Sequence, residues 1–510
     1  MKLTDVQQQI ENKPVNLIVR ASAGTGKTQT MVTKIATEIN NNGSHKSIAA
    51  ITFTIKAAQE IKDRLTVDSS CHFIGTNNSF VIEEIIKPFL KDVYGVAFDV
   101  DMSTDYSTHV NTFEEGLAKI EQEQLLCSYS DIKKNFIFDL SLDIIKKSNA
   151  CRLYLQAKYF KIYIDEYQDC DMSMHNLFMY ICDVLHIDTF VVGDDKQSIY
   201  IWRGAYPEAF NNIWNKPNFK KIFMSDNFRS CQQIQNYSNL LYKETRNLYI
   251  PTKDLGNIIW ITCKSNEWVN EVLKYVDKKK RIAFIRHKNC DAENGAIKLS
   301  DAGIKFIFVP QLPITDITTQ TAWLYNAIAK YILLPKYSVY DLISEIPAEG
   351  NIERKNITII KQMLEDIKNS YLTKKFNEVI NNLCAYLGYD TRPDHLEKLF
   401  LTISDTKYRA AFDTDMYQNI AITLHSSKGL EFDQVILFAS DYNLYKKPDI
   451  CNHYVAVTRA KEKVIIVELE DRWSRQFKSD LSKIFALSNL KIDDLVKYNK
   501  KEDIIDFIDW

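Results

Sequence analysis

Short continuous runs of apolar residues alternate along this chain with longer stretches in which apolar residues recur at helical spacing. The strand-like runs are residues 15–19, 48–53, 162–164, 190–193, 222–224, 258–262, 282–285, 420–424, 435–438 and 464–467. Strands that alternate with amphipathic helices are typical of parallel sheets covered by helices on both faces. The pattern therefore predicts an α/β fold with two such sheets, one before and one after about residue 220.

A glycine-rich segment joins the first strand to an amphipathic helix. Small residues let successive backbone N–H groups curve around an anion at a helix N-terminus, where the helix dipole also favours negative charge. This context predicts a nucleoside triphosphate site, with Lys27 on the β- and γ-phosphates and the Thr28 hydroxyl on Mg²⁺. The residues of the phosphate loop are Ala21, Ser22, Ala23, Gly24, Thr25, Gly26, Lys27 and Thr28.

Two carboxylates follow the strand-like run at residues 160–164. Asp165 at the strand end can hold the metal ion if it faces the phosphate loop. Glu166 is then placed to polarise an attacking water, which predicts hydrolysis rather than transfer to another acceptor. An acidic cluster after a strand can also be a solvated loop or a helix cap. The phosphate loop upstream favours the catalytic interpretation.

The chain resembles the UvrD, Rep and PcrA group of superfamily one helicases in several segments that keep the family's order. The segments are residues 3–7, 52–60, 75–80, 191–205, 227–230, 423–432 and 454–460. Each segment alone is a modest signal, whereas the ordered set is specific. The resemblance extends over residues 3–466 and implies two RecA-like motor domains, ATP as substrate and Mg²⁺ as its metal ion.

The family also implies a division of the chain into motor domains and two short, mostly helical insertions. The first motor domain would comprise residues 1–85 and 150–217, with an insertion at 86–149. The second would comprise residues 218–312 and 412–510, with an insertion at 313–411. At 510 residues the chain is long enough for about three to four domains of ordinary size.

Roles at the nucleotide follow from the same resemblance. Gln197 is similar to the residue that senses the γ-phosphate. Arg229 and Arg459 resemble arginine fingers, and a planar, permanently charged guanidinium suits the anionic transition state of phosphoryl transfer. The residues that would hold the adenine edge, the adenine face and the ribose are Gln7, Phe228 and Glu431.

Further positions match those that face single-stranded DNA in the family. A single strand is held by basic groups on its phosphates and by aromatic faces under its bases. The candidate residues are Phe53, Thr76, Tyr200, Trp202 and His425. Trp202 beside Arg203 on a loop is poorly explained as a core residue, whereas Tyr200 and Phe53 could each be ordinary core aromatics.

Composition limits how DNA could be bound and where the protein acts. The formal net charge is −2, so a nucleic-acid site must be a local basic patch in a cleft. The sequence has no basic-apolar leader and no apolar stretch of membrane-spanning length, which predicts a cytoplasmic protein without membrane contact. The ten cysteines include no Cys-x-x-Cys pair, so reduced thiols and no structural metal are expected.

Several strings resemble the helicase-like subunits of the two-gene Gabija antiphage system. They are residues 75–77 with Phe80, 134–136, 175–180, 198–205 and 439–443. The resemblance implies a hetero-oligomer with a GajA-like subunit that joins an ATPase to a Toprim endonuclease. Composition and spacing do not indicate that partner.

Two residues and one segment depart from the helicase pattern. Gln29 stands where Arg is frequent, Asn78 replaces a common His, and residues 449–453 replace an acidic-basic run that couples nucleotide state to DNA grip. ATP hydrolysis is therefore better supported than processive unwinding.

Three functions remain open from the sequence. The first is a DNA-stimulated ATPase that serves a nuclease partner as sensor and motor, with 3′→5′ polarity. The second is a self-sufficient 3′→5′ repair helicase. The third is a nucleotide-gated scaffold that binds its partner and DNA ends without translocation.

Overall fold

The computed structural model describes residues 3–12, 15–99, 102–317, 319, 321–346 and 354–499. The chain divides into two compact units. The first comprises Met1–Met102, His109–His287 and Leu424–Trp510, and the second comprises Ser103–Thr108 and Lys288–Thr423. Parts of the predicted domains at residues 1–2, 13–14, 100–101, 318, 320, 347–353 and 500–510 lie outside the described residues.

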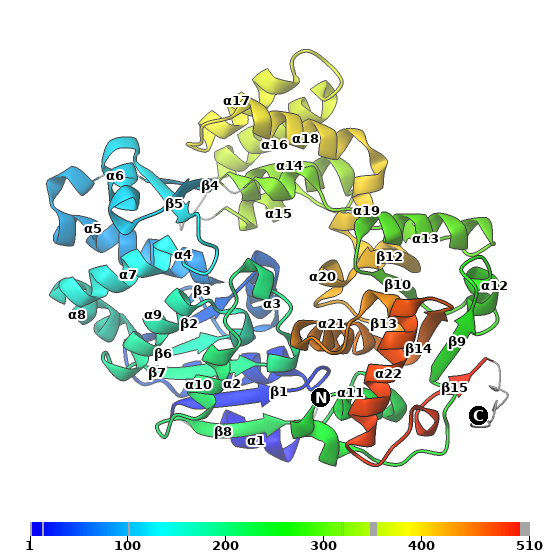
Figure 1. Ribbon diagram of the computed structural model, residues 1–510. Coiled ribbons are helices and arrows are strands. Elements are labelled where there is room, and N and C mark those ends of the chain that lie inside the picture. Colours follow the sequence, from blue (N-terminus) through cyan, green and yellow to red (C-terminus); the bar gives the residue numbers. More distant parts are fainter. Residues whose placement is uncertain are drawn as a thin grey trace, which may run out of the picture. The chain divides into compact units, whose positions relative to one another are not determined.

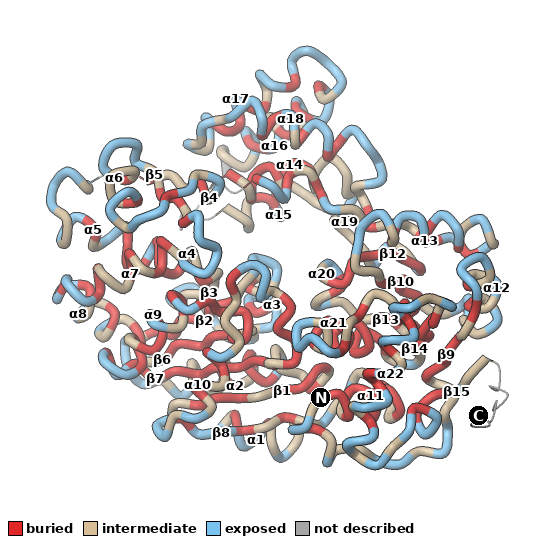
Figure 2. Tube along the Cα trace, in the orientation of Figure 1, coloured by how far each residue is buried: buried red, intermediate tan, exposed pale blue. Residues whose placement is uncertain are grey.

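One parallel sheet in the first unit has the strand order β3-β2-β6-β7-β1-β8 (Figure 1). Its strands are β1 (Leu17–Ala21), β2 (Ser47–Thr52), β3 (Phe73–Thr76), β6 (Tyr159–Ile164), β7 (Asp188–Gly193) and β8 (Lys220–Met224). The inner strands are buried along most of their length (Figure 2), as expected for strands rich in Val and Ile that are covered on both faces. Because the strands are parallel, their carboxyl ends share one edge of the sheet.

Five strands of the second parallel sheet lie in the same unit, in the order β10-β13-β14-β9-β15. They are β9 (Ile258–Cys263), β10 (Ile282–Arg286), β13 (Phe432–Phe438), β14 (Ala460–Leu469) and β15 (Lys497–Tyr498). The predicted α/β fold with two parallel sheets is thereby confirmed.

Helices surround these strands in the first unit. They are α1 (Asp5–Glu11), α2 (Lys27–Asn41), α3 (Ile55–Arg64), α4 (Asn77–Val81), α5 (Lys87–Tyr94), α6 (Phe113–Glu123), α7 (Phe136–Lys147), α8 (Asn149–Lys158), α9 (Met172–Asp183), α10 (Glu208–Trp214), α11 (Gln232–Leu240), α12 (Trp268–Leu273), α20 (Leu424–Ser427), α21 (Lys447–Val457) and α22 (Arg472–Ala486). Two strands, β4 (Ser103–Val110) and β5 (Leu125–Tyr129), lie within the first predicted insertion. Among the described residues, no helix has the length and apolar character needed to cross a membrane.

The second unit is mainly helical. It contains α13 (Asn289–Asp301), α14 (Ala322–Leu333), α15 (Val339–Ser344), α16 (Arg354–Ser370), α17 (Phe376–Tyr386), α18 (Pro393–Ser404) and α19 (Arg409–Phe412), with the parallel strands β11 (Ile307–Phe308) and β12 (Asn419–Thr423). Leu324, Ile328, Leu364, Leu383 and Leu399 are fully buried in one apolar core that joins α14, α16, α17 and α18.

The predicted boundary after residue 217 falls too early in the chain. Strand β8 pairs with β1 from Leu17–Lys220 to Ala21–Met224, so it is the edge strand of the first sheet. Motifs predict a boundary before this strand, because the pairing of β8 with β1 leaves no local signal in the sequence. Because β8 lies beside β1, residues 227–230, which follow β8, lie close to the phosphate loop that follows β1.

Candidate functional site

The phosphate loop joins β1 to α2 through two glycines with left-handed backbones. Gly24 has φ +77° and Gly26, the N-cap of α2, has φ +79°. A Cβ on Gly24 would overlap the Asn227 side chain and lie 2.8 Å from Arg229 Cβ. The Phe228 N–H donates to the Gly24 carbonyl at 2.9 Å. Glycine is therefore required at residue 24 both by conformation and by space.

Lys27 and Glu166 meet at the carboxyl edge of the first sheet. Lys27 Nζ lies 3.1 Å from Glu166 Oε1, although the two residues follow different strands, β1 and β6. Glu166 has φ +48°, a left-handed conformation that costs a non-glycine residue free energy and is often found at functional sites. Burial would raise the pKa of Glu166, but the charges of Lys27 and Lys428 outweigh it and lower the pKa. Glu166 is thus an ionised carboxylate beside the phosphate loop.

Asp165 is the predicted metal ligand, together with Thr28 at the start of α2. Burial and then the charge of Glu166 raise the pKa of Asp165. A cation beside this carboxylate would relieve both effects, so the donor set fits Mg²⁺. Within the described residues, no three His, Cys, Asp or Glu side chains gather as a metal site. Bound Mg²⁺ would neutralise charge on the phosphates, with Asp165 and Thr28 as its protein ligands.

Lys428 is a residue of this site that the sequence analysis did not select. Its ammonium pairs with Asp169, lies 3.8 Å from Glu166 Oε2, and lies 4.8 Å from the Tyr200 ring centroid. Burial would lower the pKa of Lys428, but Asp169 and Glu166 raise it. Its position inside the matched segment at residues 423–432 is the sequence signal that could have identified Lys428 as a site residue. Lys428 is a second cation, besides Lys27, at the candidate catalytic carboxylate.

Arg459 and Gln197 lie in contact, 262 residues apart. The Arg459 guanidinium donates to Gln197 Oε1 at 3.3 Å and to the Val455 and Leu430 carbonyls at 3.0 and 3.2 Å. Arg459 is only 2% exposed, and no carboxylate of the described residues lies within ion-pair distance of it. Burial and then the charge of Arg229 lower the pKa of Arg459. A buried cation without a charged partner is costly, and an anion nearby would stabilise it.

Arg229 and Glu431 form an ion pair. Arg229 Nε lies 2.9 Å from Glu431 Oε2, and Lys461 Nζ lies 2.6 Å from Glu431 Oε1. The side chain of Glu431, the predicted ribose contact, is partly exposed and holds Arg229 beside the Thr458 carbonyl, 3.3 Å away. In this structure Glu431 positions a predicted arginine finger.

A small cavity lies between the predicted base-binding residues. Gln7 and Phe228 both line it, with Thr4, Val6, Thr25, Met224, Ser225 and Asp226. Gln7 is held by a capping box with Thr4, in which each side chain accepts the other's backbone N–H at 3.0 and 3.2 Å. The Phe228 ring is 49% exposed, so its face is available for stacking. The structure thus brings Gln7 and Phe228 together beside the phosphate loop.

Aromatic and basic side chains gather around His425. Trp202 Nε1 donates to His425 Nε2 at 3.1 Å, and the Arg203 guanidinium lies 4.6 Å from the Trp202 ring centroid. The Tyr200 ring lies 6.0 Å from the His425 ring. His287, which the sequence analysis did not select, stacks on His425 with an interplanar angle of 24°. Trp202 is 55% exposed and is therefore not a core residue.

The last two DNA-contact candidates lie at the carboxyl ends of the paired strands β2 and β3: Phe53 directly follows β2, and Thr76 is the last residue of β3. Phe53 is half-buried. The Thr76 hydroxyl accepts the Ser79 N–H at 3.2 Å as the N-cap of α4. Thr76 therefore has a structural role, which its spacing from Ser79 could have indicated.

The segment that departs most from the helicase pattern, residues 449–453, lies in α21. His453 is fully buried among Tyr237, Tyr442 and Phe477, and burial lowers its pKa to about 3. A neutral, packed imidazole thus stands where charged side chains are usual in the family.

Comparisons with known proteins agree with this arrangement. An AAA domain model matches residues 4–203, and the model of the UvrD-like helicase C-terminal domain matches residues 420–467. The Gabija protein GajB of Bacillus cereus (strain VD045) is 40% identical over 502 residues, covering 96% of this chain and 99% of that protein. A probable DNA helicase II homolog of Rickettsia conorii (strain ATCC VR-613 / Malish 7) is 24% identical, covering 89% of this chain and 90% of that protein.

The similarity extends to an ATP-dependent DNA helicase of another bacterium. The ATP-dependent DNA helicase Rep of Buchnera aphidicola subsp. Acyrthosiphon pisum (strain APS) is 28% identical over 331 residues, covering 52% of this chain and 50% of that protein. The GajB match extends over nearly the whole of both chains at 40% identity. The chain therefore belongs to the GajB family of UvrD-like helicases.

Proposed function

We propose that the protein is an Mg²⁺-dependent ATP hydrolase that DNA stimulates, and that it serves a GajA-like nuclease subunit as DNA sensor and motor in antiphage defence. The observation that carries the proposal is the meeting of Lys27 with Glu166 at the phosphate loop, 3.1 Å apart, within a chain of the GajB family. This geometry supplies a phosphate anchor and a candidate base in one place.

In this mechanism each side chain acts on ATP or on the attacking water. The phosphate-loop N–H groups and Lys27 bind the phosphates, and this binding draws Lys27 away from Glu166. Glu166, ionised because of its cationic neighbours, then orients a water and accepts its proton. Arg459 and Arg229 stabilise negative charge on the transferring phosphoryl group.

We propose that the nucleotide binds between the two sheets of the first unit, with each sheet supplying some of the residues that contact it. The first sheet supplies Lys27, Asp165, Glu166 and Gln197, and the second supplies Arg459. Hydrolysis would change the contacts of Gln197 and Arg459. Because Trp202 follows Gln197 by only five residues, the loop that carries Trp202 would move as well. That change would let the protein move along DNA by one base per cycle, and similarity to UvrD-like helicases supports 3′→5′ polarity for the movement.

The proposal is tested by measuring ATP hydrolysis and strand displacement with and without the partner subunit. We expect DNA to stimulate hydrolysis by the chain alone, and strand displacement to require the partner. Strand displacement by the chain alone would favour a self-sufficient repair helicase. Binding of DNA ends without stimulated hydrolysis would favour a nucleotide-gated scaffold and would contradict the proposal.

The first prediction concerns DNA coupling at Trp202. Trp202→Ala is expected to abolish most DNA stimulation of ATPase activity and to weaken single-strand binding by about 1–3 kcal/mol, because a base loses its stacking partner. The basal ATPase rate without DNA should stay nearly unchanged, since the described side chains that Trp202 contacts, Arg203 and His425, are not predicted nucleotide-binding residues. ATPase rates across a DNA titration check both effects.

Trp473→Ala is the matched control for this change. Trp473 on α22 is 62% exposed, similar to Trp202, and lies outside the candidate site. Both variants should melt close to the wild-type temperature. A folded Trp202→Ala protein with undiminished DNA stimulation would exclude the stacking role.

A further inference from the structure

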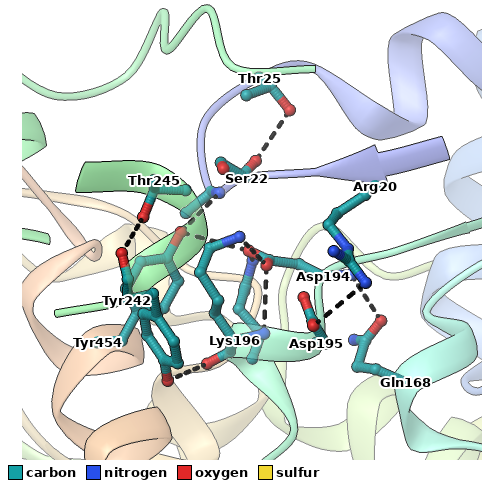
Figure 3. A network of polar contacts seen from close by, with 12 residues as sticks. Arg20, Ser22, Thr25, Gln168, Asp194, Asp195, Lys196, Tyr242, Thr245 and Tyr454 are labelled. Carbon is teal, nitrogen blue, oxygen red and sulfur yellow. Dashed lines mark hydrogen bonds and ion pairs between the residues drawn. The ribbon is translucent and has the colours of Figure 1, made fainter. Parts of the chain in front are cut away.

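The Tyr454 hydroxyl bridges the phosphate loop and the end of β7 (Figure 3). It accepts the Ala23 N–H at 3.2 Å and donates to Asp194 Oδ2 at 3.3 Å. Tyr454 comes from α21, beside the second sheet, whereas Ala23 and Asp194 follow strands of the first sheet. One hydroxyl thus connects the two halves of the candidate nucleotide site.

Asp194 extends this connection to Arg459. The Gln197 amide donates to Asp194 Oδ2 at 2.8 Å, and Gln197 Oε1 accepts from the Arg459 guanidinium at 3.3 Å. The other carboxylate oxygen of Asp194 forms an ion pair with Lys196, whose Nζ lies 2.6 Å from Asp194 Oδ1. The contacts form one chain from the loop backbone to the predicted arginine finger.

Burial makes this chain of hydrogen bonds sensitive to each of its members. Tyr454 is 1% exposed, and Asp194, Gln197 and Arg459 are also buried. Burial and then the charge of Asp194 raise the pKa of Tyr454 well above its usual range, so the hydroxyl keeps its proton. A buried polar group that loses its hydrogen-bond partner cannot bond to water instead, which costs free energy. When one of these four side chains moves, the side chain bonded to it is therefore expected to follow.

Packing holds the Tyr454 ring in place independently of its hydroxyl. The Tyr242 ring meets it edge to face at a centroid distance of 5.5 Å, and the Lys196 ammonium lies 5.5 Å from its centroid. Removal of the hydroxyl alone should therefore leave the ring where it is. This separation makes a conservative substitution informative.

We propose that Tyr454 is a positioning residue that couples occupancy of the phosphate loop to the placement of Arg459, through Asp194 and Gln197. The inference rests on the proposed ATP hydrolysis. Phosphate oxygens approaching the loop compete with the Tyr454 hydroxyl for the Ala23 N–H. When the Tyr454 hydroxyl no longer accepts the Ala23 N–H, it is bonded to Asp194 alone. The Asp194 carboxylate in turn positions the Gln197 amide, and Gln197 Oε1 positions the Arg459 guanidinium.

Tyr454→Phe tests this coupling through kcat and KM. We expect kcat for ATP to fall about 10-fold, since misplacement of a catalytic group by a fraction of an ångström is costly, while KM changes less than about 3-fold. In a double-mutant cycle, Tyr454→Phe should reduce kcat by less than about 2-fold when Arg459→Ala is already present. A residue that acts through Arg459 has nothing left to position in that background.

Tyr237→Phe is the matched control. Tyr237 is another buried phenol of the first unit, and its hydroxyl lies 2.9 Å from His453 Nε2, with no contact to the phosphate loop. The Tyr237→Phe variant should have a kcat within about 2-fold of that of the wild type. Equal losses in Tyr454→Phe and Tyr237→Phe, or full additivity of Tyr454→Phe with Arg459→Ala, would overturn the inference.

A binding measurement separates this inference from the proposed function. Calorimetric titration of ATP into Glu166→Gln and into Glu166→Gln/Tyr454→Phe should give dissociation constants within about 3-fold of each other. A larger loss of affinity would show that the hydroxyl acts in ground-state binding and would overturn the positioning role. Absence of hydrolysis by the wild-type chain, with and without DNA, would instead contradict the proposed function.

Discussion

Glu166→Gln is expected to reduce ATP hydrolysis by about 10²- to 10⁴-fold while ATP still binds. The amide keeps the size of the carboxylate but cannot accept a proton from the attacking water. Lys27→Ala should behave differently, because it removes the phosphate anchor and weakens binding as well as hydrolysis. Single-turnover hydrolysis and calorimetric ATP titration distinguish the two outcomes.

Glu84→Gln is the control for loss of a carboxylate. Glu84 is also largely buried and pairs with Lys158 at 2.8 Å, away from the phosphate loop. Its hydrolysis rate should stay close to that of the wild type. Hydrolysis near the wild-type rate by Glu166→Gln would instead show that another group activates the water.

Arg459→Ala and Arg229→Ala should each reduce the rate of hydrolysis by about 10³-fold, as for arginine fingers of related chemistry. Arg459 is buried without a carboxylate partner among the described residues, so the phosphoryl group is the anion that its environment favours. Arg229 is paired with Glu431 in this structure, which holds its guanidinium near the candidate site. ATP affinity, measured separately from the rate, should fall much less than the rate in both variants.

Arg152→Ala provides the comparison for these two changes. Arg152 on α8 also donates to main-chain carbonyls, those of Ile145 and Lys146, at 2.8 and 2.7 Å. Loss of that structural arginine should alter stability and leave kcat nearly unchanged. Equal losses of affinity and rate in Arg459→Ala would identify a ground-state binding residue rather than a finger.

The strands and the phosphate loop could be predicted from the sequence because their signals are local. A buried parallel strand is a continuous apolar run, and the glycines at 24 and 26 mark left-handed backbone that few other residues adopt. Membership of a sheet is not local, however. Strand β8 was placed in the wrong motor domain because its pairing with β1 joins residues about two hundred positions apart.

Partners of charged and polar side chains were harder to predict for the same reason. Glu431 stood within a matched segment, but its ion pair with Arg229 depends on a residue 202 positions away. Lys428 and Tyr454 likewise lie in matched segments, but their partners Asp169 and Ala23 are far from them in sequence, so their roles could not be predicted. Thr76 is the exception, because its partner Ser79 is only three residues away.

The close approach of Gly24 to Asn227 and Phe228 has a consequence for how this protein can evolve. The loop that would cradle the phosphates and the aromatic ring that would stack on the base share a backbone hydrogen bond and leave no room for a side chain at residue 24. A substitution that shifts Phe228 to admit a different base would also displace Gly24. Changes of base preference and changes of turnover should therefore arise together, and natural variants should keep glycine at residue 24 while residues 227 and 228 change together.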